Sequence, residues 1–452
     1  MFHQKSVRQI HQEFLSGALS PREVASESVN RFRRFEASFH AWVSFDEAHI
    51  FSCAEQLRTQ LEGGGRVLQP FDGIPIGVKD VFNTCDFPTQ MGSDLWAGFT
   101  PGNDARVVSY LKNVGGIIAG KTVTAEFAVH ALNHTLNPHD VSLTPGTSSS
   151  GSAVAVSLGI VPVCLGTQTG ASIIRPASFC GVYGYKPSFG LLPRTGCLKT
   201  TDSLDTIGFL SSHADNLRPL FNATRVRGPN FPISNRALKD ATRQTKRGGD
   251  RWRVAFFKTY TWEQSTDEAK NSLLSYLRAL GSLNSVEVEE VPLPEGMIAA
   301  HQVHSLIYEK SLSYYFQQEA KSVRNISPIM KDMILKGEKI STREFHEALR
   351  EQERMIEVMD SLLSKFDAGI SLSTAGEAPK RGDTEPDDPS LIWTLSHLPT
   401  ISVPQFLSQN ELPFGLQIFA RKYNDYLLLN FLDFLRGIDM AKNVSPPRGM
   451  DQ

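Results

Sequence analysis

Cysteine is scarce in this 452-residue sequence, and its five copies are odd in number and show no C-x-x-C spacing. That pattern argues against a disulfide framework, and no Cys/His spacing suggests a zinc site. Cys164 and Cys180 lie in apolar stretches and are interpreted as small buried hydrophobes. We therefore expect a reducing compartment, the cytoplasm.

An excess of charge is also missing. The chain has 46 Lys and Arg against 48 Asp and Glu, a formal net charge of −2, which gives no reason to expect nucleic acid or a membrane as partner. No apolar run approaches the roughly 20 residues that a membrane span needs, and the first residues lack the order of a signal peptide. We expect a small-molecule substrate. The sequence leaves the oligomeric state open, a homodimer included.

Short apolar runs alternate with helical patterns from residue 70 onward, which predicts an α/β fold with a largely buried sheet. Residues 6–62 are expected to be helical, and Gly63-Gly64-Gly65 to end that segment. The polar stretch 222–251 is interpreted as a surface connection, with an anion-binding patch as the alternative.

Toward the C-terminus, two further elements stand out. Ser341 and Glu344 form a capping box that predicts a helix as far as about residue 365. Residues 397–406 and 412–420 predict a closing pair of strands.

Two short motifs match known sequence patterns, but the segments around them do not predict the structure that those patterns require. Residues 115–122, GGIIAGKT, fit G-x-x-x-x-G-K-[ST], a pattern that needs a Gly-rich loop whose amides face phosphates. Here a helix precedes the segment, and its apolar interior predicts a strand, with Lys121 leaning toward the surface. A nucleotide site at 115–122 is kept as an alternative. Ser109 and Lys112 fit S-x-x-K, but they lie in the middle of a predicted helix and lack the partner motifs.

Histidine is absent from residues 140–212, where small hydroxyl side chains gather among glycines. The stretches TSSSGS (147–152) and GTQTGAS (166–172) each lead into apolar chain, so a catalytic role would need another base. Lys79 ends the apolar run GIPIGVK. In a desolvated site its ammonium would be disfavoured, which leaves a neutral amine able to act as a base. The alternatives are that Lys79 marks the exit of a strand into water or pairs with Asp80.

The two serines at issue are Ser148 and Ser172. A Gly-containing turn leads into a helical start at Ser172, so successive backbone N–H groups would point at one oxyanion. The alternative for Ser172 is a simple N-cap. For Ser148 it is turn chemistry in a Gly/Ser loop.

Taken together, these stretches resemble the amidase signature family, the amidohydrolases with a Ser-Ser-Lys triad. GIPIGVKD matches the lysine strand of the family, GTSSSGS its serine loop with one change, and GTQTGAS with the following RP and FCGVYGYKPSFG its nucleophile region. Ser148 and Ser172 are 24 residues apart, as in the family. The resemblance is dense over residues 70–210, thin over 215–370, and returns at 390–430.

The resemblance implies a single-domain α/β/α sandwich with a large twisted mixed β-sheet, one amidase domain over residues 1–452. Within it we expect an N-terminal helical segment (1–65) and a signature core (70–210). A variable substrate-side region (215–370) and the closing strands and helix (371–440) would follow.

The resemblance also implies roles for individual residues. Ser172 would be the acyl-accepting nucleophile, Ser148 the proton relay that follows a cis peptide bond, and Lys79 the general base. The oxyanion hole would consist of backbone N–H groups from Thr169, Gly170, Ala171 and Ser172. No metal and no organic cofactor is implied.

Three positions need separate attention. Thr147 replaces the usual glycine before Ser148 and restricts the backbone there. Ala171 replaces the commoner glycine before Ser172. Arg175 lies three residues after Ser172, and in relatives with this spacing that act on small carboxylated amides, the Arg can hold a substrate carboxylate. The alternative is an Arg ion-paired inside the fold.

The predicted activity is hydrolysis of a linear carboxamide, a small-molecule amide, through an acyl-enzyme. Acyl transfer to an amine is one alternative. The glutaminase (A) subunit of a tRNA-dependent amidotransferase is another, against which the Arg spacing, Gln168 and the short middle region argue. The sequence does not identify the substrate, because the resemblance is weakest where the pocket would be shaped: residues 85–100, 125–140 and 295–380.

Overall fold

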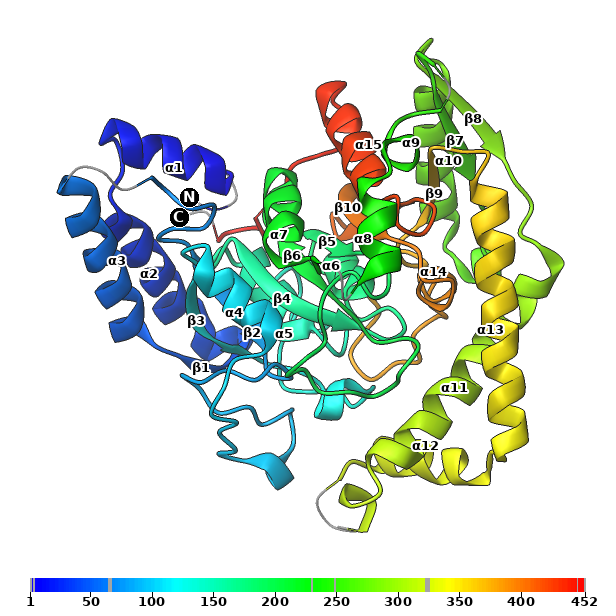
Figure 1. Ribbon diagram of the computed structural model, residues 1–452, viewed down its shortest axis with the longest axis horizontal. Helices are drawn as coiled ribbons and strands as arrows, with labels where there is room; N and C mark the ends of the chain where they lie inside the picture. The colour runs from blue at the N-terminus through cyan, green and yellow to red at the C-terminus, as the bar shows by residue number, and fades with distance from the viewer. Residues whose placement is uncertain are drawn as a thin grey trace.

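The computed structural model of the protein describes residues 2, 5–63, 67–228, 231–247, 249–321, 326–444 and 446–450. Gly64 and Gly65, expected to help end the N-terminal helical segment, lie outside the described residues. A mixed sheet of 11 strands runs through the described chain, and helices pack around it (Figure 1). The predicted α/β class with a large mixed sheet is confirmed.

The order of the strands explains how distant segments meet. It is β1-β3-β2-β4-β6-β5-β10-β11-β9-β7-β8. β2 lies between β3 and β4 and runs parallel to both, so three carboxyl ends share one edge of the sheet, where α/β proteins bind ligands. β10 and β11 form the predicted antiparallel closing pair. The strands are β1 (Trp42–Phe45), β2 (Pro75–Lys79), β3 (Ile117–Thr122), β4 (Val163–Gln168), β5 (Tyr183–Lys186), β6 (Thr206–Ser211), β7 (Trp252–Phe256), β8 (Val286–Glu290), β9 (Ala368–Leu372), β10 (Thr400–Leu407) and β11 (Pro413–Phe419).

Local sequence explains where several helices begin. Ser6, Ser20 and Ser341 each accept a hydrogen bond from the backbone three positions on and complete a capping box, which confirms the helix predicted from Ser341. The helices are α1 (Val7–Ser16), α2 (Pro21–Phe39), α3 (Glu47–Glu62), α4 (Arg106–Asn113), α5 (Ser150–Ser157), α6 (Ile174–Phe179), α7 (Leu217–Thr224), α8 (Pro232–Lys239), α9 (Ala241–Gln244), α10 (Asp267–Gly281), α11 (Ala300–Tyr315), α12 (Pro328–Lys339), α13 (Thr342–Leu363), α14 (Leu391–Leu395) and α15 (Asp425–Gly437).

One expectation about local structure is wrong, and a second is incomplete. Residues 6–62 are not helical throughout, because β1 interrupts them and pairs with β3 through a register shift between Trp42 and Ser44. Residues 222–251 are mostly exposed or half-buried, as a surface connection would be, and the short helices α8 and α9 lie within them. A strand of four residues and helices of eight and four residues are too short to show a clear period in the sequence.

Lys121 corrects the expectation for the GGIIAGKT segment. The segment contributes β3, which is buried along its whole length, so no loop of free amides exists there. Lys121 does not lean toward the surface: its side chain is fully buried, and its Nζ lies 2.9 Å from a carboxylate oxygen of Asp80. It also donates to the backbone oxygen of Phe82 and to Thr89 Oγ1. The geometry is that of a structural ion pair.

The helices α11, α12 and α13 form a unit at the opposite side of the molecule from α1–α3 in Figure 1. Their facing side chains build a second hydrophobic core, to which α14 contributes Ile392, Trp393 and Leu395. α11 packs on α14, and its His304 contacts the carbonyl oxygen of Thr169, which directly follows β4.

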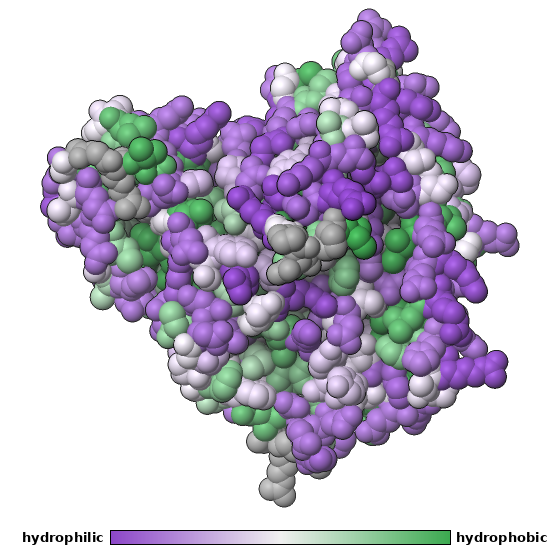
Figure 2. Space-filling model, in the orientation of Figure 1, coloured by the Kyte–Doolittle hydropathy of each residue, from purple (hydrophilic) through white to green (hydrophobic). Residues whose placement is uncertain are grey.

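The outer surface carries little contiguous apolar area in the view of Figure 2, where hydrophobic residues are scattered among hydrophilic ones. No helix in the described ranges combines the length and the apolar character that crossing a bilayer requires.

Candidate active site

Lys79 lies at the carboxyl end of β2, buried between β3 and β4. Gly77 permits the close packing, because a Cβ there would lie 2.4 Å from Cys164 Sγ. Burial lowers the pKa of Lys79 from its ordinary value of 10.5 to about 7. Both alternative interpretations of this residue are wrong, because Lys79 does not emerge into water and Asp80 pairs with Lys121 instead.

Three hydroxyl groups surround the Lys79 amine. Nζ lies 2.6 Å from Ser148 Oγ, 3.0 Å from Ser149 Oγ and 2.8 Å from Thr167 Oγ1. Ser149 Oγ donates its own proton to the backbone oxygen of Thr167, at 3.2 Å. Of the two serines, Ser148 therefore has its hydroxyl proton free to face the amine.

The backbone before Ser148 differs from the expectation. No cis peptide bond occurs in the described residues, so the predicted cis bond is wrong and Ser148 follows a trans bond. The short contact between Ser148 and Lys79 is made with this trans bond. Thr147, which takes the place of a glycine, accepts a hydrogen bond from the Arg175 guanidinium through its Oγ1, at 2.7 Å.

Ser172 lies in the turn between β4 and α6, on the wall of a cavity of about 370 Å³. Within the described chain its hydroxyl has no hydrogen-bond partner, so the structure brings Lys79 and Ser148 into contact but does not join Ser148 to Ser172. The backbone N–H groups of Gly170, Ala171 and Ser172 also donate to no acceptor in the described residues. Oxyanion stabilisation requires backbone N–H donors that are not already paired, and these lie beside the Ser172 hydroxyl.

Several supports of this turn were not predicted from the sequence. Asp205 accepts a hydrogen bond from Thr169 Oγ1 at 2.8 Å, and it lies within residues 70–210, where the family resemblance is dense. His304 and Thr394 contact the carbonyl oxygens of Thr169 and Gly170. The resemblance to the family covered Asp205, but no motif in the sequence indicated His304 or Thr394.

Arg175 is already neutralised in the structure. Its guanidinium lies 2.6 Å from Glu385 and 3.2 Å from Asp388, and its side chain is 7% exposed. Burial raises the pKa of Asp388 to about 6, although the neighbouring Arg175 opposes that shift. This geometry favours the ion-paired alternative over a free carboxylate-binding Arg.

The cavity beside Ser172 is more acidic than basic. It is formed by the serine loops, by α11 and α12, and by the loop before α14. Arg175 and three histidines, His130, His301 and His304, line it together with five carboxylates: Glu309, Asp383, Glu385, Asp387 and Asp388.

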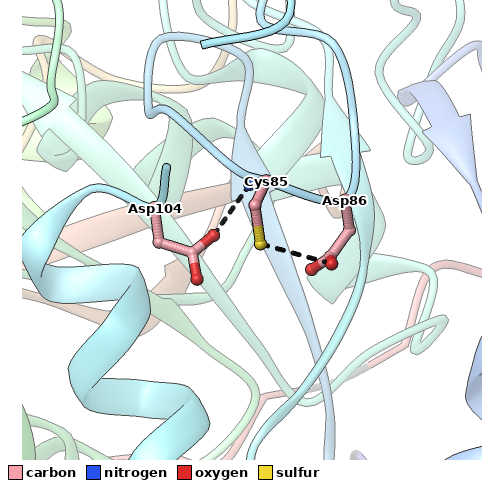
Figure 3. A group of neighbouring side chains, drawn as sticks. All are labelled: Cys85, Asp86 and Asp104. Atoms are coloured by element: carbon pink, nitrogen blue, oxygen red, sulfur yellow. Dashed lines mark hydrogen bonds between the residues drawn. The ribbon is translucent and has the colours of Figure 1, made fainter. Parts of the chain in front are cut away.

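A separate cluster of Cys85, Asp86 and Asp104 has side chains that bind metals in other proteins (Figure 3). Cys85 Sγ donates to Asp86 at 3.3 Å, and the Cys85 backbone N–H donates to Asp104 at 2.9 Å. The Lys112 ammonium contacts Asp86, lies 3.1 Å from Asp104 Oδ1, and lies 3.3 Å from the sulfur. The Lys112 ammonium therefore already pairs with the carboxylates of this cluster. These ion pairs tie the loop that contains Cys85 and Asp86 to α4.

Residues 23–429 match the family model for amidases. The chain therefore belongs to the amidase signature family, as its motifs predicted.

Its sequence relatives include the A subunit of the glutamyl-tRNA(Gln) amidotransferase of Staphylococcus haemolyticus, which is 27% identical over 467 residues, covering 94% of this chain and 95% of that protein. The corresponding protein of a Cyanothece strain is 35% identical over 230 residues, 50% of this chain and 48% of that protein. Among solved structures, an amidase superposes with a TM-score of 0.86 at 25% identity, covering 96% of this chain and all of that one. The peptide amidase of Stenotrophomonas maltophilia gives 0.81 at 20% identity, over 99% of both chains; at that identity it shows the fold alone.

Proposed function

We propose that this protein is an amidohydrolase that cleaves a linear carboxamide through an acyl-enzyme on Ser172. The observation that carries the proposal is the 2.6 Å contact between the buried amine of Lys79 and the Ser148 hydroxyl. A serine hydroxyl is a weak nucleophile until a base takes its proton. A lysine whose pKa burial lowers to about 7 can be that base near neutral pH.

In the proposed reaction, Ser172 Oγ bonds to the amide carbon while its proton passes to Ser148 Oγ and the Ser148 proton passes to Lys79. The electrons of the C=O bond move to the oxygen, which the N–H groups of Thr169, Gly170, Ala171 and Ser172 stabilise. The C–N bond then breaks, and the leaving nitrogen takes the proton back along the same route. Water repeats the sequence on the acyl-enzyme and releases the acid. The missing Ser148–Ser172 hydrogen bond is the contact that substrate binding has to complete, since such contacts are often long in ligand-free enzymes.

For the substrate, the charges in the cavity favour an amide whose acyl part carries no carboxylate. Arg175 already has two carboxylate partners, and the other acidic side chains of the cavity would repel an anion. Acyl transfer to an amine in place of water uses the same intermediate and belongs to the same proposal. The unpaired cysteines fit action in the reducing cytoplasm.

The second candidate is the glutaminase component of a tRNA-dependent amidotransferase, because relatives with that name align over more than nine-tenths of the chain. That function would require partner proteins. Amide hydrolysis by the purified chain alone would favour the amidohydrolase.

Labelling with a fluorophosphonate tests the role of Ser172. We expect one covalent adduct, located at Ser172 by mass spectrometry, and none in Ser172→Ala. An adduct on Ser148 or Ser149 would overturn the assignment of the nucleophile.

A further inference from the structure

In the turn after β4, two backbone carbonyl oxygens are hydrogen-bonded to side chains from other helices. The Thr169 oxygen lies 2.9 Å from His304 Nε2, and the Gly170 oxygen accepts a hydrogen bond from Thr394 Oγ1 at 2.7 Å. His304 belongs to α11 and Thr394 to α14. Two elements from outside the lysine and serine motifs thus reach the backbone that precedes Ser172.

Holding a carbonyl oxygen also orients the next N–H group. A peptide unit is planar and trans, so its C=O and N–H bonds point in opposite directions. The hydrogen bond from His304 therefore sets the direction of the Gly170 N–H, and the bond from Thr394 sets that of the Ala171 N–H. Neither N–H donates to an acceptor in the described chain.

The protonation of His304 is determined by its surroundings. The side chain is buried, and burial lowers the pKa of His304 to about 4. A neutral imidazole has one N–H, and a carbonyl oxygen only accepts, so the proton lies on Nε2. The Tyr308 ring, one turn further along α11, packs against the imidazole with ring centres 5.6 Å apart.

Thr394 also takes part in a second set of hydrogen bonds that stabilises the same turn. Its Oγ1 accepts a hydrogen bond from Gln168 Nε2 at 2.9 Å. Gln168 Oε1 in turn accepts from the N–H groups of Ile173 and Ile174, at 2.8 and 3.0 Å. The Gln168 side chain thereby links the start of the turn to its end at Ile173 and Ile174.

We propose that His304 is a positioning residue for the oxyanion hole: it does not touch the reacting atoms, and it acts by fixing the peptide unit between Thr169 and Gly170. This inference rests on the proposed amidohydrolase function. It links α11, in the segment where the family resemblance is thin, to the chemistry at Ser172.

The test uses the rate of fluorophosphonate labelling, because the attack on phosphorus places a developing negative oxygen where the amide oxyanion would lie. The saturation curve gives the maximal inactivation rate, kinact, and the half-saturation constant, KI. For His304→Phe we expect kinact to fall 10- to 100-fold with KI within about 3-fold of wild type, since loss of one oxyanion donor typically costs about 10²–10³. His304→Gln, which keeps an N–H donor, should recover most of the rate.

Gln302→Ala is the matched control, because Gln302 is an exposed residue on the same helix and does not line the cavity; its labelling should match wild type. Unchanged kinact in His304→Phe, or a rise in KI alone, would overturn the inference, and a rise in KI alone would make His304 a ligand contact. If His304→Phe does not fold, as judged by circular dichroism, Thr394→Val tests the same orientation through the next peptide unit, and an unchanged kinact there also contradicts the inference. Failure of the proposed function looks different: wild type would then carry no adduct at Ser172.

Discussion

Lys79 and Lys121 show how two buried lysines in adjacent strands acquire different roles. Lys121 lies against the Asp80 carboxylate and completes an ion pair. Lys79 meets only hydroxyl groups among its hydrogen-bond partners in the described chain, so no carboxylate pairs directly with its amine. Burial outweighs the more distant charge of Asp205, which favours the ammonium. Chain neighbours in and beside a strand point in opposite directions, which is why Asp80 serves the lysine of β3 and not the adjacent Lys79.

The two serines beside Lys79 make a matched pair of variants. Ser148→Ala should lower the second-order rate of fluorophosphonate labelling about 10²–10⁴-fold, since it removes the proposed proton path from Ser172 to the amine. Ser149→Ala should lower it less than 10-fold, because the Ser149 proton is committed to the Thr167 carbonyl. The labelling rates of the two variants and wild type, measured side by side, check this. Equal losses in both variants would contradict the assignment of Ser148 as relay.

At the scale of elements, the site depends on close approach between α5 and the end of β3. Gly151, in the first turn of α5, leaves no room for a side chain: a Cβ there would lie 2.4 Å from the Ala41 oxygen and 2.4 Å from the Val123 nitrogen. Both neighbours are backbone atoms and cannot rotate away. The loop that carries Ser148 therefore leads into a helix whose position is set by the sheet.

Gly151→Ala should push α5 from the sheet, lower the free energy of unfolding by about 1–3 kcal/mol, and slow labelling by moving Ser148. Gly437→Ala is the control, since a Cβ at Gly437 would meet nothing within 4 Å. Urea unfolding of both variants measures the difference. Equal stability in the two variants would show that α5 can shift without cost.

The chain's motifs predicted the class of fold and the three residues of the proposed triad, because those residues lie in short segments with a recognisable pattern. His304 and Thr394 could not be predicted in the same way. They lie 135 and 224 positions from their partners in the turn, and only packing of α11 and α14 brings them there. The burial of Lys121 was missed for a related reason, since its partner Asp80 lies 41 positions away.

For the whole molecule, the net charge is close to zero, but the charged side chains are distributed unevenly. Five carboxylates and one arginine, Arg175, line the cavity beside Ser172, and two of those carboxylates already pair with Arg175. Charges in such a concave, partly buried site act on a ligand more strongly than charges on the open surface.

The charges predict a preference among three acyl p-nitroanilides of equal length that end in an ammonium, a methyl group or a carboxylate. We expect kcat/KM to be at least about 10-fold lower for the carboxylate than for the ammonium at low salt, and the gap to narrow as salt increases. Glu385→Gln, which removes one partner of Arg175, should further reduce the difference in kcat/KM between the ammonium and carboxylate substrates. A higher kcat/KM for the carboxylate substrate than for the ammonium substrate would contradict this prediction and would indicate that Arg175 binds a substrate carboxylate.

In the proposed mechanism, the buried amine of Lys79 is uncharged near neutral pH and accepts the proton that Ser172 loses. Burial lowers the pKa of this group, so the base form is present above about pH 7, whereas an ordinary lysine would need a pH above 10.5. The most direct test is the second-order rate of fluorophosphonate labelling at Ser172 as a function of pH, in wild type and in Lys79→Ala. We expect the wild-type rate to rise about tenfold per pH unit up to about pH 7 and then to stay constant. In Lys79→Ala we expect a slow rate without that rise. A wild-type rate that does not change between pH 5 and 9, or that Lys79→Ala leaves intact, would contradict it.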